Sequence, residues 1–521
     1  MKNFKLFSAI LALLISVSFS EAQNQNCPVI PQPVKAVKKE GAFLLNRYTS
    51  IRISGESLAG VAAYLQYELL ADKRLPLSIG NITGTPAINI SISRSGKSPA
   101  EGYRLNISKE RIDITAGSEK GAFYGVISLL QLIKTQDSSE LIKIPAWNIE
   151  DKPLYTWRGL MLDESRHFFG KATVKKLLDW MAFYKLNTFH WHLTDEPGWR
   201  IEIKQYPLLT LVGGIGNYTD KFGAAQYYTQ EDIKEIVDYA AKRFITIIPE
   251  IDMPGHATAA NRAYPQYTGG GNDKHPNFTF NPGNASTYLF LSNILREVNA
   301  LFPARMLHVG GDEVSFGNDK WLADIGVQRL LEKKKLKDVK GVERYFMERM
   351  ADSIYNMNAK MLAWDEVADM NLDKNKTILF WWRHDQPRQL TKALSKKYDI
   401  VLCPRLPFYF DFVQDSTHTL GRKWGEEYNS LEHVYNFNIN KIQQISASNR
   451  QQILGIQANL WTETIKDEKR LCYMIFPRIA ALAETAWTDA GNKSFSDFKA
   501  NLEKQYRLYS EQQINFYQAA N

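Results

Sequence analysis

The sequence predicts an α/β protein, a (β/α)8 TIM barrel preceded by a small α+β domain. From residue 151 onward, short apolar strand-like segments alternate with segments of helical periodicity. Eight such strand-like segments occur over about 330 residues, which suits a barrel with long loops. The 521 residues, of which 44% are hydrophobic and 23% charged, have an ordinary globular composition and are long enough for two domains.

The first 22 residues have the composition of an export signal. Lys2 and Lys5 precede an apolar run over 6–19, and the small residues Ser20 and Ala22 follow it. We expect residues 1–22 to be a signal peptide and the mature chain to be exported, either periplasmic or secreted; a retained N-terminal anchor is the alternative. The apolar run is short for a membrane span and no later run is longer, so we expect no transmembrane segment in the mature chain.

Residues 23–150 are expected to form the N-terminal α+β domain. Alternating apolar and polar residues predict strands over 87–93 and 111–116, and helical patterns cover 58–70 and 121–133. No group of acids or histidines is concentrated here. We therefore expect a supporting role for this domain.

Residues 151–493 are expected to form the catalytic barrel, and 494–521 a C-terminal helical tail. The seventh and eighth barrel units are less regular than the others. The predicted strands are 158–163, 188–192, 245–251, 306–309, 361–364, 378–382, 400–403 and 453–459. The predicted helices between them include 172–184, 230–243, 285–301 and 342–357.

Charge and cysteine content indicate no special partner. The formal net charge is +8, but Lys and Arg are spread along the chain, and we expect the run Lys333–Lys335 to be a solvated helix face. Diffuse basicity of this kind gives no reason to expect a nucleic acid partner. Of the three cysteines, Cys27, Cys403 and Cys472, at least one must be unpaired, and Cys403 lies in an apolar run typical of a core.

Reactive residue types follow the predicted strands, where the active sites of such barrels lie. The second strand leads into His190–Asp195, the third into Glu250–His256 and the fourth into His308–Glu313. Later strands lead to Trp364, Trp382, Tyr409, Asp411, Trp461 and Glu463. Aromatic faces stack on the apolar faces of a pyranose, and carboxylates and arginine bind its hydroxyls. The pattern therefore indicates a sugar site.

One motif makes this interpretation specific. His308-Val309-Gly310-Gly311-Asp312-Glu313 resembles the H-x-G-G-D-E signature of family 20 glycoside hydrolases, the β-N-acetylhexosaminidases. The supporting matches, in the family's order, are Trp157-Arg158-Gly159, His190-Trp191-His192-Leu193-Thr194-Asp195, Asp252-Met253-Pro254-Gly255-His256 and Trp461-Thr462-Glu463. The resemblance implies an exo-acting, retaining hydrolase that releases terminal β-linked N-acetylglucosamine or N-acetylgalactosamine from a glycan or chitooligosaccharide. It implies no cofactor and no metal.

The pair Asp312-Glu313 also suggests a mechanism. Two neighbouring carboxylates repel and burial disfavours charge, so one of them should have a raised pKa, which suits Glu313 as proton donor. Sequence neighbours are poorly placed to bracket a sugar as the two carboxylates of an ordinary retaining glycosidase do. The resemblance implies that the substrate's acetamido carbonyl attacks instead, forming an oxazolinium ion. Asp312 would then hold the acetamido N–H and Tyr409 its oxygen, while Glu313 later activates water.

The remaining roles are carried over from the resemblance, and alternatives stay open for several. Arg158 is expected at the ring's 3- and 4-hydroxyls, although it could form a salt bridge at the barrel floor instead. The other expected contacts are Asp411 and Glu463 at O4 and O6, Trp364, Trp382 and Trp461 around the acetamido group and sugar, and Asp195 and His256 near the acid. Alternation along the strand points Trp382 inward and Trp381 outward, but the two could be exchanged.

Two other functions are compatible with the same barrel. His190, His192, His256 and His308 lie on successive strands and could bind zinc in a metal-dependent amidohydrolase. That hypothesis leaves the Gly-Gly-Asp-Glu motif and the tryptophans unexplained. A non-catalytic amino-sugar-binding protein would keep the aromatic residues but would have little need for both Asp312 and Glu313. The sequence therefore favours the hydrolase.

Overall fold

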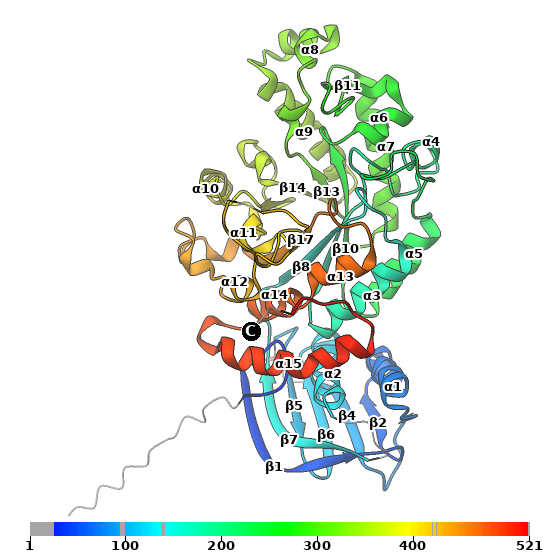
Figure 1. Ribbon diagram of the computed structural model, residues 1–521, viewed down its shortest axis with the longest axis vertical. Coiled ribbons are helices and arrows are strands. Elements are labelled where there is room, and N and C mark those ends of the chain that lie inside the picture. The colour runs from blue at the N-terminus through cyan, green and yellow to red at the C-terminus, as the bar shows by residue number, and fades with distance from the viewer. Residues whose placement is uncertain (1–25, 94–98, 137–140, 419, 424, 519–521) are drawn as a thin grey trace, which may run out of the picture.

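The computed structural model describes residues 26–93, 99–136, 141–418, 420–423 and 425–518. A smaller domain lies below a large barrel, and the green segments labelled α8 and β11 lie farthest from it (Figure 1). The predicted signal peptide, residues 1–22, lies outside the described residues. Within the described ranges, no helix is long and apolar enough to cross a membrane.

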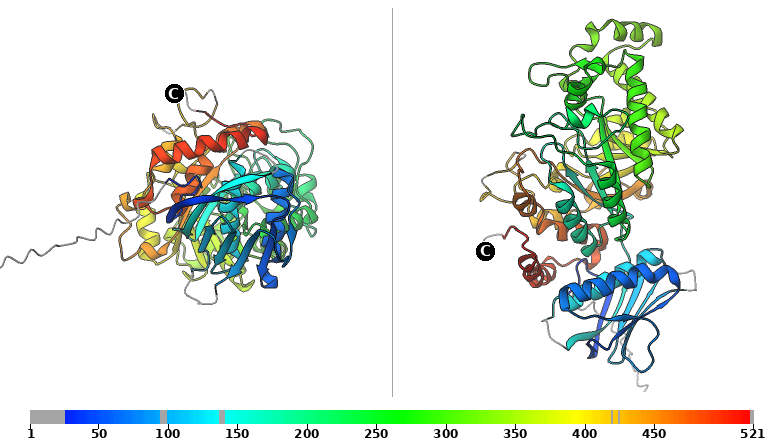
Figure 2. Two further views of the ribbon diagram at one scale, coloured as in Figure 1. Left: turned by 90° about the horizontal axis from the view of Figure 1, so that it is seen from below. Right: turned by 90° about the vertical axis from the view of Figure 1, so that its right-hand side faces the viewer.

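The N-terminal domain is a seven-stranded sheet of order β1-β7-β5-β6-β4-β2-β3 with two helices on one face (Figure 2). Its elements are β1 (Lys35–Leu45), β2 (Ser50–Ser54), α1 (Ala59–Lys73), β3 (Ser78–Ile79), β4 (Ala87–Ile92), β5 (Tyr103–Ile107), β6 (Arg111–Ala116), α2 (Glu119–Lys134) and β7 (Ile142–Asp151). Helix α2 is buried along nearly its whole length because it packs on β5 and β6 and also contacts the barrel helix α3 (Gly170–Phe183). The predicted small α+β domain is confirmed.

The second domain is a closed barrel in which all eight strands run parallel. The strands are β8 (Trp157–Asp163), β9 (Thr188–His192), β10 (Thr246–Met253), β13 (Met306–Gly310), β14 (Lys360–Trp364), β15 (Thr377–Trp381), β16 (Asp399–Leu402) and β17 (Ile453–Leu460). Every predicted strand is present with its ends shifted by two residues at most. The predicted barrel is therefore confirmed.

Helices cover the outside of the barrel (Figure 1). The main ones are α3, α5 (Gln230–Ala241), α7 (Ala285–Leu301), α9 (Val339–Asn356), α10 (Pro387–Ser395), α13 (Glu468–Ile475) and α14 (Arg478–Trp487). Between β16 and β17 the described residues form two short α-helices, α11 (Arg405–Phe408) and α12 (Leu431–Tyr435), and two 3-10 turns, which explains the irregular seventh unit. Smaller additions are α6 (Thr258–Ala263), α8 (Ile325–Lys334) and the strand pair β11 (Thr268–Gly270) and β12 (Thr279–Phe280).

Side chains tie the two domains together. Strand β7 ends at Asp151, whose carboxylate accepts hydrogen bonds from Trp487 Nε1 at 2.9 Å and from Tyr103 Oη at 2.6 Å. After residue 494, helix α15 (Phe495–Glu511) packs across both domains, and its Gln505 accepts from Tyr184 of the barrel and donates to Gln131 of α2. These contacts hold the base of the barrel on the smaller domain, which leaves the opposite end for the site.

Cysteines and surface charge agree with the sequence analysis where the structure describes them. The three cysteines are all buried and free. The run Lys333–Lys335 is exposed at the end of α8, as expected of a solvated helix face.

Candidate active site

A cavity of about 480 Å³ lies at the C-terminal ends of the barrel strands. Ten of the eleven side chains predicted for the site line it: Asp195, His256, Asp312, Glu313, Trp364, Trp382, Tyr409, Asp411, Trp461 and Glu463. Arg166, Arg405, Phe412, Arg422 and Lys423 complete the lining. The loops after seven of the eight strands thus meet around one space rich in acids and aromatic rings.

The eleventh predicted residue, Arg158, does not reach the cavity. It is the second residue of β8, at the strand end that faces the smaller domain, and its side chain is fully buried. Its guanidinium donates to Glu101 at 2.8 Å, to Tyr124 Oη at 2.7 Å and to the backbone oxygens of Lys185 and Tyr155 at 2.9 and 2.7 Å. The prediction that Arg158 contacts the sugar is therefore wrong, and its alternative, a salt bridge at the barrel floor, is what the structure contains.

Arg166 is the arginine that the same strand sends to the cavity. It lies three residues beyond the end of β8, is nearly buried, and donates to Asp195 Oδ2 at 2.7 Å. Its guanidinium also lies 5.1 Å from the centre of the Trp461 ring. Although burial alone would lower the pKa of Arg166, the surrounding carboxylates of Asp195 and Asp163 raise it, so the side chain stays charged.

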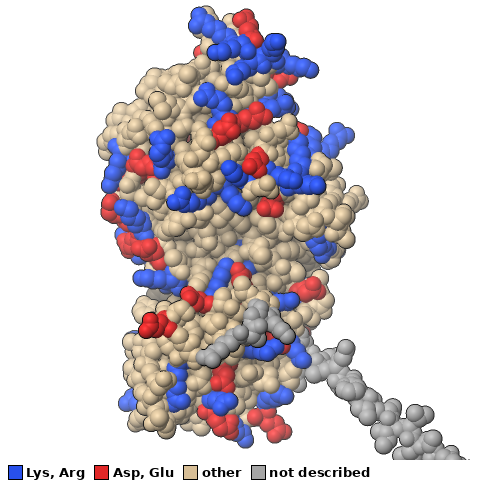
Figure 3. Space-filling model, turned by 180° about the vertical axis from the view of Figure 1, so that it is seen from behind, with Lys and Arg blue, Asp and Glu red and all other residues tan. Residues whose placement is uncertain are grey.

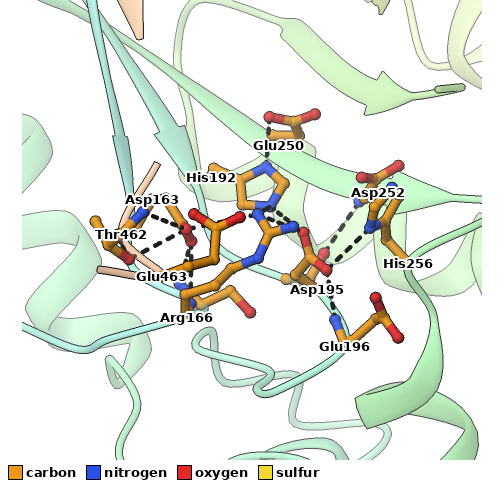
Figure 4. A network of polar contacts seen from close by, with 12 residues as sticks. Asp163, Arg166, His192, Asp195, Glu196, Glu250, Asp252, His256, Thr462 and Glu463 are labelled. Carbon is orange, nitrogen blue, oxygen red and sulfur yellow. Dashed lines mark hydrogen bonds and ion pairs between the residues drawn. The ribbon is translucent and has the colours of Figure 1, made fainter. Parts of the chain in front are cut away.

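Asp195 is the centre of a buried polar network that includes Arg166, His192 and His256 (Figure 4). Its carboxylate accepts from Arg166, from His192 Nε2 at 2.9 Å and from His256 Nδ1 at 3.0 Å. Burial on its own would raise the pKa of Asp195, but the positive charges of Arg166 and His256 hold it well below the usual value. Asp195 is therefore a fixed negative charge that orients its three partners.

His256 carries this network to Asp312 and Glu313. Its Nε2 lies 3.6 Å from Asp312 Oδ2 and 3.7 Å from Glu313 Oε2, and the ring is nearly buried. Burial opposes the charged imidazolium, but the carboxylates of Asp195, Asp252 and Asp312 raise the pKa of His256 well above its usual value. A protonated His256 thus faces both members of the acid pair from one side.

The two glycines of the motif bring the acid pair to this position. Gly310 and Gly311 have φ of +63° and +90°, values that side chains with a Cβ rarely adopt. A Cβ on Gly310 would lie 1.7 Å from Asp252 Oδ1, so only glycine lets β13 pass this close to β10. The tight turn directs Asp312 and Glu313 into the cavity.

Asp312 is a member of the acid pair whose pKa is raised by its surroundings. Burial is the main cause and the neighbouring charge of Glu313 adds to it, while His256 opposes it, and the resulting pKa is about 7. The Asp312 side chain is 11% exposed, whereas the Glu313 side chain is 32% exposed. The expectation that one of two adjacent carboxyl groups has a raised pKa is confirmed for Asp312, and the role of Glu313 as proton donor stays a prediction.

Aromatic rings form the walls of the cavity. Trp382 and Tyr409 are nearly parallel, with ring centres 6.2 Å apart, and Trp364 lies 5.9 Å from Trp461. Trp364 and Trp382 are fixed by hydrogen bonds from their indoles to Glu250 at 2.9 Å and to Glu366 at 3.1 Å. Trp381 packs in the core on the outer side of β15, so the predicted orientation of the two neighbours is correct.

A charged group of Asp411, Arg422 and Glu463 closes another side of the cavity. Arg422 Nη2 donates to Glu463 Oε1 at 2.5 Å and its Nε lies 3.9 Å from Asp411 Oδ2. Burial, and to a lesser extent the nearby charge of Glu463, raises the pKa of Asp411 to about 8. Neither carboxylate oxygen of Asp411 has a hydrogen-bond partner among the described residues, so this buried group is available to a ligand's hydroxyls.

Three of the four histidines that could have suggested a metal site surround one buried glutamate, while the fourth, His256, lies in the cavity with Asp312 and Glu313. His190, His192 and His308 each place a ring nitrogen 2.7–2.9 Å from Glu250, which also accepts from Trp364. Ligand atoms of His190, Glu250 and His308 do lie within 4.8 Å of one another, yet these three side chains are fully buried and none lines the cavity. The group forms a polar floor under Trp364 and Asp195 and does not present an open position to a substrate.

Comparison with known protein families shows which family has both domains of this chain. Residues 155–490 match the family described as "Glycosyl hydrolase family 20, catalytic domain", and residues 26–152 match its "domain 2". The chain belongs to glycoside hydrolase family 20. The predicted resemblance is thereby confirmed for both domains.

Curated relatives of the chain carry the corresponding activity in their names. A β-hexosaminidase of Porphyromonas gingivalis is 34% identical over 96% of this chain and 67% of its own length. A β-hexosaminidase of Vibrio furnissii is 32% identical over 87% of this chain and 76% of its own. This family 20 chain is accordingly a β-N-acetylhexosaminidase, a glycoside hydrolase.

Solved structures agree with this assignment. The family 20 exo β-N-acetylglucosaminidase of Vibrio harveyi, solved with N-acetylglucosamine, is 30% identical and superposes with a TM-score of 0.87 over 99% of this chain and 81% of its own. The β-N-acetylhexosaminidase of Bacteroides fragilis is 31% identical, with a TM-score of 0.81 over 94% of this chain and 97% of its own.

Sequence reasoning assigned no role in the site to Arg166, which follows the first strand, or to four other cationic or apolar residues of the cavity. Arg405, Phe412, Arg422 and Lys423 all lie in the irregular segment between β16 and β17. This segment has no helical or strand period that would have placed its side chains. For Arg166 a signal existed, because it follows the C-terminal end of a predicted strand.

Proposed function

We propose that the chain removes a terminal β-linked N-acetylglucosamine or N-acetylgalactosamine with retention, using the substrate's own acetamido oxygen as nucleophile. The observation that carries this proposal is the placement of Asp312 and Glu313. Both approach the same His256 nitrogen and therefore lie on one side of the cavity. A retaining glycosidase with an enzymic nucleophile needs two carboxyl groups about 5–5.5 Å apart on opposite sides of the reacting carbon.

The other carboxyl groups of the cavity are unsuitable nucleophiles. Asp411, with a pKa of about 8, is largely protonated near neutral pH and a protonated carboxyl attacks poorly. Glu463 is held by Arg422 through Oε1. The missing nucleophile is supplied if the acetamido carbonyl of the substrate attacks the anomeric carbon and forms an oxazolinium ion.

Glu313 and Asp312 have different roles in this reaction. Glu313, the more exposed of the two, donates a proton to the glycosidic oxygen and later takes one from the water that opens the oxazolinium ion. Asp312 accepts the acetamido N–H and, as a carboxylate, stabilises the positive charge that develops on that group. Tyr409 donates its hydroxyl to the acetamido oxygen, and Trp364, Trp382 and Trp461 exclude water around it.

Other side chains hold the sugar ring. Arg166 takes the role that the sequence gave to Arg158, binding ring hydroxyls while Asp195 orients it. Asp411 and Glu463 bind the hydroxyls at O4 and O6, where the unpartnered oxygens of both residues are available. The bound sugar in the Vibrio harveyi structure supports the same exo action here.

The natural setting is part of the proposal. The substrate is a glycan or chitooligosaccharide with a terminal N-acetylhexosamine, and the composition of residues 1–22 supports export to the periplasm or the medium. Hydrolysis of this kind consumes only water and calls for no cofactor.

The test compares an aryl β-N-acetylglucosaminide with the matching aryl β-glucoside, each with and without a chelator. We expect rapid cleavage of the first substrate alone, unchanged by the chelator. Equal cleavage of both substrates would refute acetamido participation. Loss of activity with the chelator would favour the metal-dependent alternative, and cleavage of neither would favour a non-catalytic binding protein.

A further inference from the structure

A second cavity of about 340 Å³ adjoins the first. It lies between the segment after β13, the first turns of α9 and the segment after β14, η5 (Asp365–Asp369). Glu313 and Trp382 line both cavities. The two spaces therefore meet at the side chain proposed as the proton donor.

This shared residue indicates what the second cavity holds. A general acid must lie within hydrogen-bond reach of the glycosidic oxygen, which joins the sugar to be released to the rest of the substrate. If the released sugar occupies the first cavity, the remainder of the chain leaves past Glu313 into the second. This step rests on the function proposed above.

Two cations on α9 face this space; electrostatic interactions couple Lys340 with Glu343 and Arg344 with Glu348, but no close ion pair forms among the described residues. Lys340 and Arg344 are exposed, lie one helical turn apart and line the second cavity. Within the described ranges, neither side chain takes part in an ion pair or a hydrogen bond. Charges left unpaired beside a substrate cavity are available to an anionic ligand.

Apart from Glu313, the acidic groups in the same lining are held by partners or have a raised pKa. Glu366 accepts from Trp382 and lies 3.3 Å from Arg383, and Asp369 is bound to Lys392 at 2.6 Å. Burial raises the pKa of Glu343, which lies between the two cations on α9, to about 7. Apart from the proposed proton donor Glu313 and the partly protonated Glu343, the charges left facing the cavity are those of Lys340 and Arg344.

The shape of the lining suits a sugar ring. Phe316 is 46% exposed at this cavity, and Trp382 provides a second aromatic surface from the shared wall. Exposed aromatic faces next to charged groups are the usual means of binding a pyranose that carries an ionised substituent. Lys and Arg also gather at the end of the molecule that carries α8, beside α9 (Figure 3), so the local potential favours an anionic chain.

We propose that the second cavity binds the sugar residue next to the cleaved bond, and that Lys340 and Arg344 select a residue bearing an anionic group. The group is a carboxylate, as on a uronic acid, or a sulfate ester. The substrate class of the enzyme is then a terminal N-acetylhexosamine attached to an acidic glycan.

The experiment uses two pairs of disaccharides with the full-length protein. N-Acetylglucosamine is β-linked to glucuronic acid or to glucose in the first pair, and to 6-sulfogalactose or to galactose in the second. For each pair the ratio of kcat/KM, acidic over neutral, is measured at pH 6.5 and low ionic strength. We expect a ratio of roughly 10 or more for at least one pair, since hydrogen bonds to charged groups are the stronger ones.

The variant Lys340→Ala/Arg344→Ala should bring that ratio close to one. It should leave the rate on the aryl N-acetylglucosaminide unchanged, because that substrate has no anionic group to bind. The matched control Lys333→Ala/Lys337→Ala also removes two exposed positive charges near this end of the molecule, but outside the cavity. It should keep the wild-type ratio.

Three results would overturn the proposal. The first is a wild-type ratio near one for both pairs, and the second is an undiminished ratio in the Lys340/Arg344 variant. The third is an equal loss in the control variant, which would assign the preference to overall charge. In each of these cases the aryl N-acetylglucosaminide is still cleaved, whereas failure to cleave it would refute the proposed function as well.

Discussion

Two arginines near the ends of one strand should respond to the same substitution in opposite ways. Arg158 begins β8 at the domain interface, and Arg166 follows its other end in the cavity. Replacement by methionine keeps much of the side-chain length and removes the charge in both cases. We expect Arg158→Met to lower stability and spare catalysis, and Arg166→Met to lower catalysis strongly.

The magnitudes follow from the contacts of each guanidinium. Arg158→Met breaks four hydrogen bonds of a fully buried side chain and leaves Glu101 without this partner, which costs about 3–5 kcal/mol of unfolding free energy. If Arg166 binds ring hydroxyls as proposed, Arg166→Met removes two charged hydrogen bonds, each about 1.5–3 kcal/mol. At about 1.4 kcal/mol per factor of ten, the loss in kcat/KM is at least about 100-fold.

The assay measures thermal unfolding and kcat/KM on the aryl N-acetylglucosaminide for the folded fraction of each variant. Arg158→Met should unfold at a lower temperature with kcat/KM within about threefold of wild type, a change smaller than one hydrogen bond would produce. The reasoning is refuted if Arg158→Met retains wild-type stability and loses activity 100-fold. It is equally refuted if Arg166→Met is fully active.

Three further predictions concern the acid pair and the turn that holds it. Glu313→Gln should lower kcat on disaccharides by about 10²–10⁴-fold with an unchanged circular dichroism spectrum, and wild-type turnover would remove Glu313 from its role. Burial raises the pKa of Asp312 to about 7 and its carboxylate is the active form, so kcat/KM should fall as the pH decreases through about 7. The variant Asp312→Asn should be slow, and its pH profile should lack this fall on the acidic side. An unchanged fall in that variant would contradict the assignment. Gly310→Ala places a Cβ 1.7 Å from Asp252 Oδ1 at a φ of +63°, so it should abolish activity, and an active, stable variant would show that the turn can rearrange.

The barrel could be predicted from the sequence because parallel strands buried on both faces consist mostly of apolar residues. The run 453–459 and the strand Ile453–Leu460 differ by one residue. The alternation of side-chain directions along β15 correctly predicted that Trp382 faces the cavity and Trp381 the core. The irregular segment between β16 and β17 could not be derived, because Arg422 is placed by its ion pair with Glu463 and not by a periodic pattern.

The motif resemblance placed Arg158 in the site, whereas the geometry of the barrel places it at the other end of the strand. The strand that contains Arg158 runs toward the site, so its second residue must lie at the opposite end from the catalytic loops. Arg166, three residues past the strand, satisfied that rule from the beginning. The raised pKa of Asp312 could not be derived in the same way, because it depends on relative burial within a pair of adjacent residues.

The central claim, attack by the substrate's acetamido oxygen, is tested most directly by changing that oxygen alone. Aryl N-acetylglucosaminides with one, two or three fluorines on the acetyl methyl keep the sugar and the leaving group constant. Each fluorine withdraws electrons from the carbonyl oxygen and weakens it as a nucleophile. We predict that kcat falls steeply with each fluorine. A kcat that stays constant across the series would contradict the account.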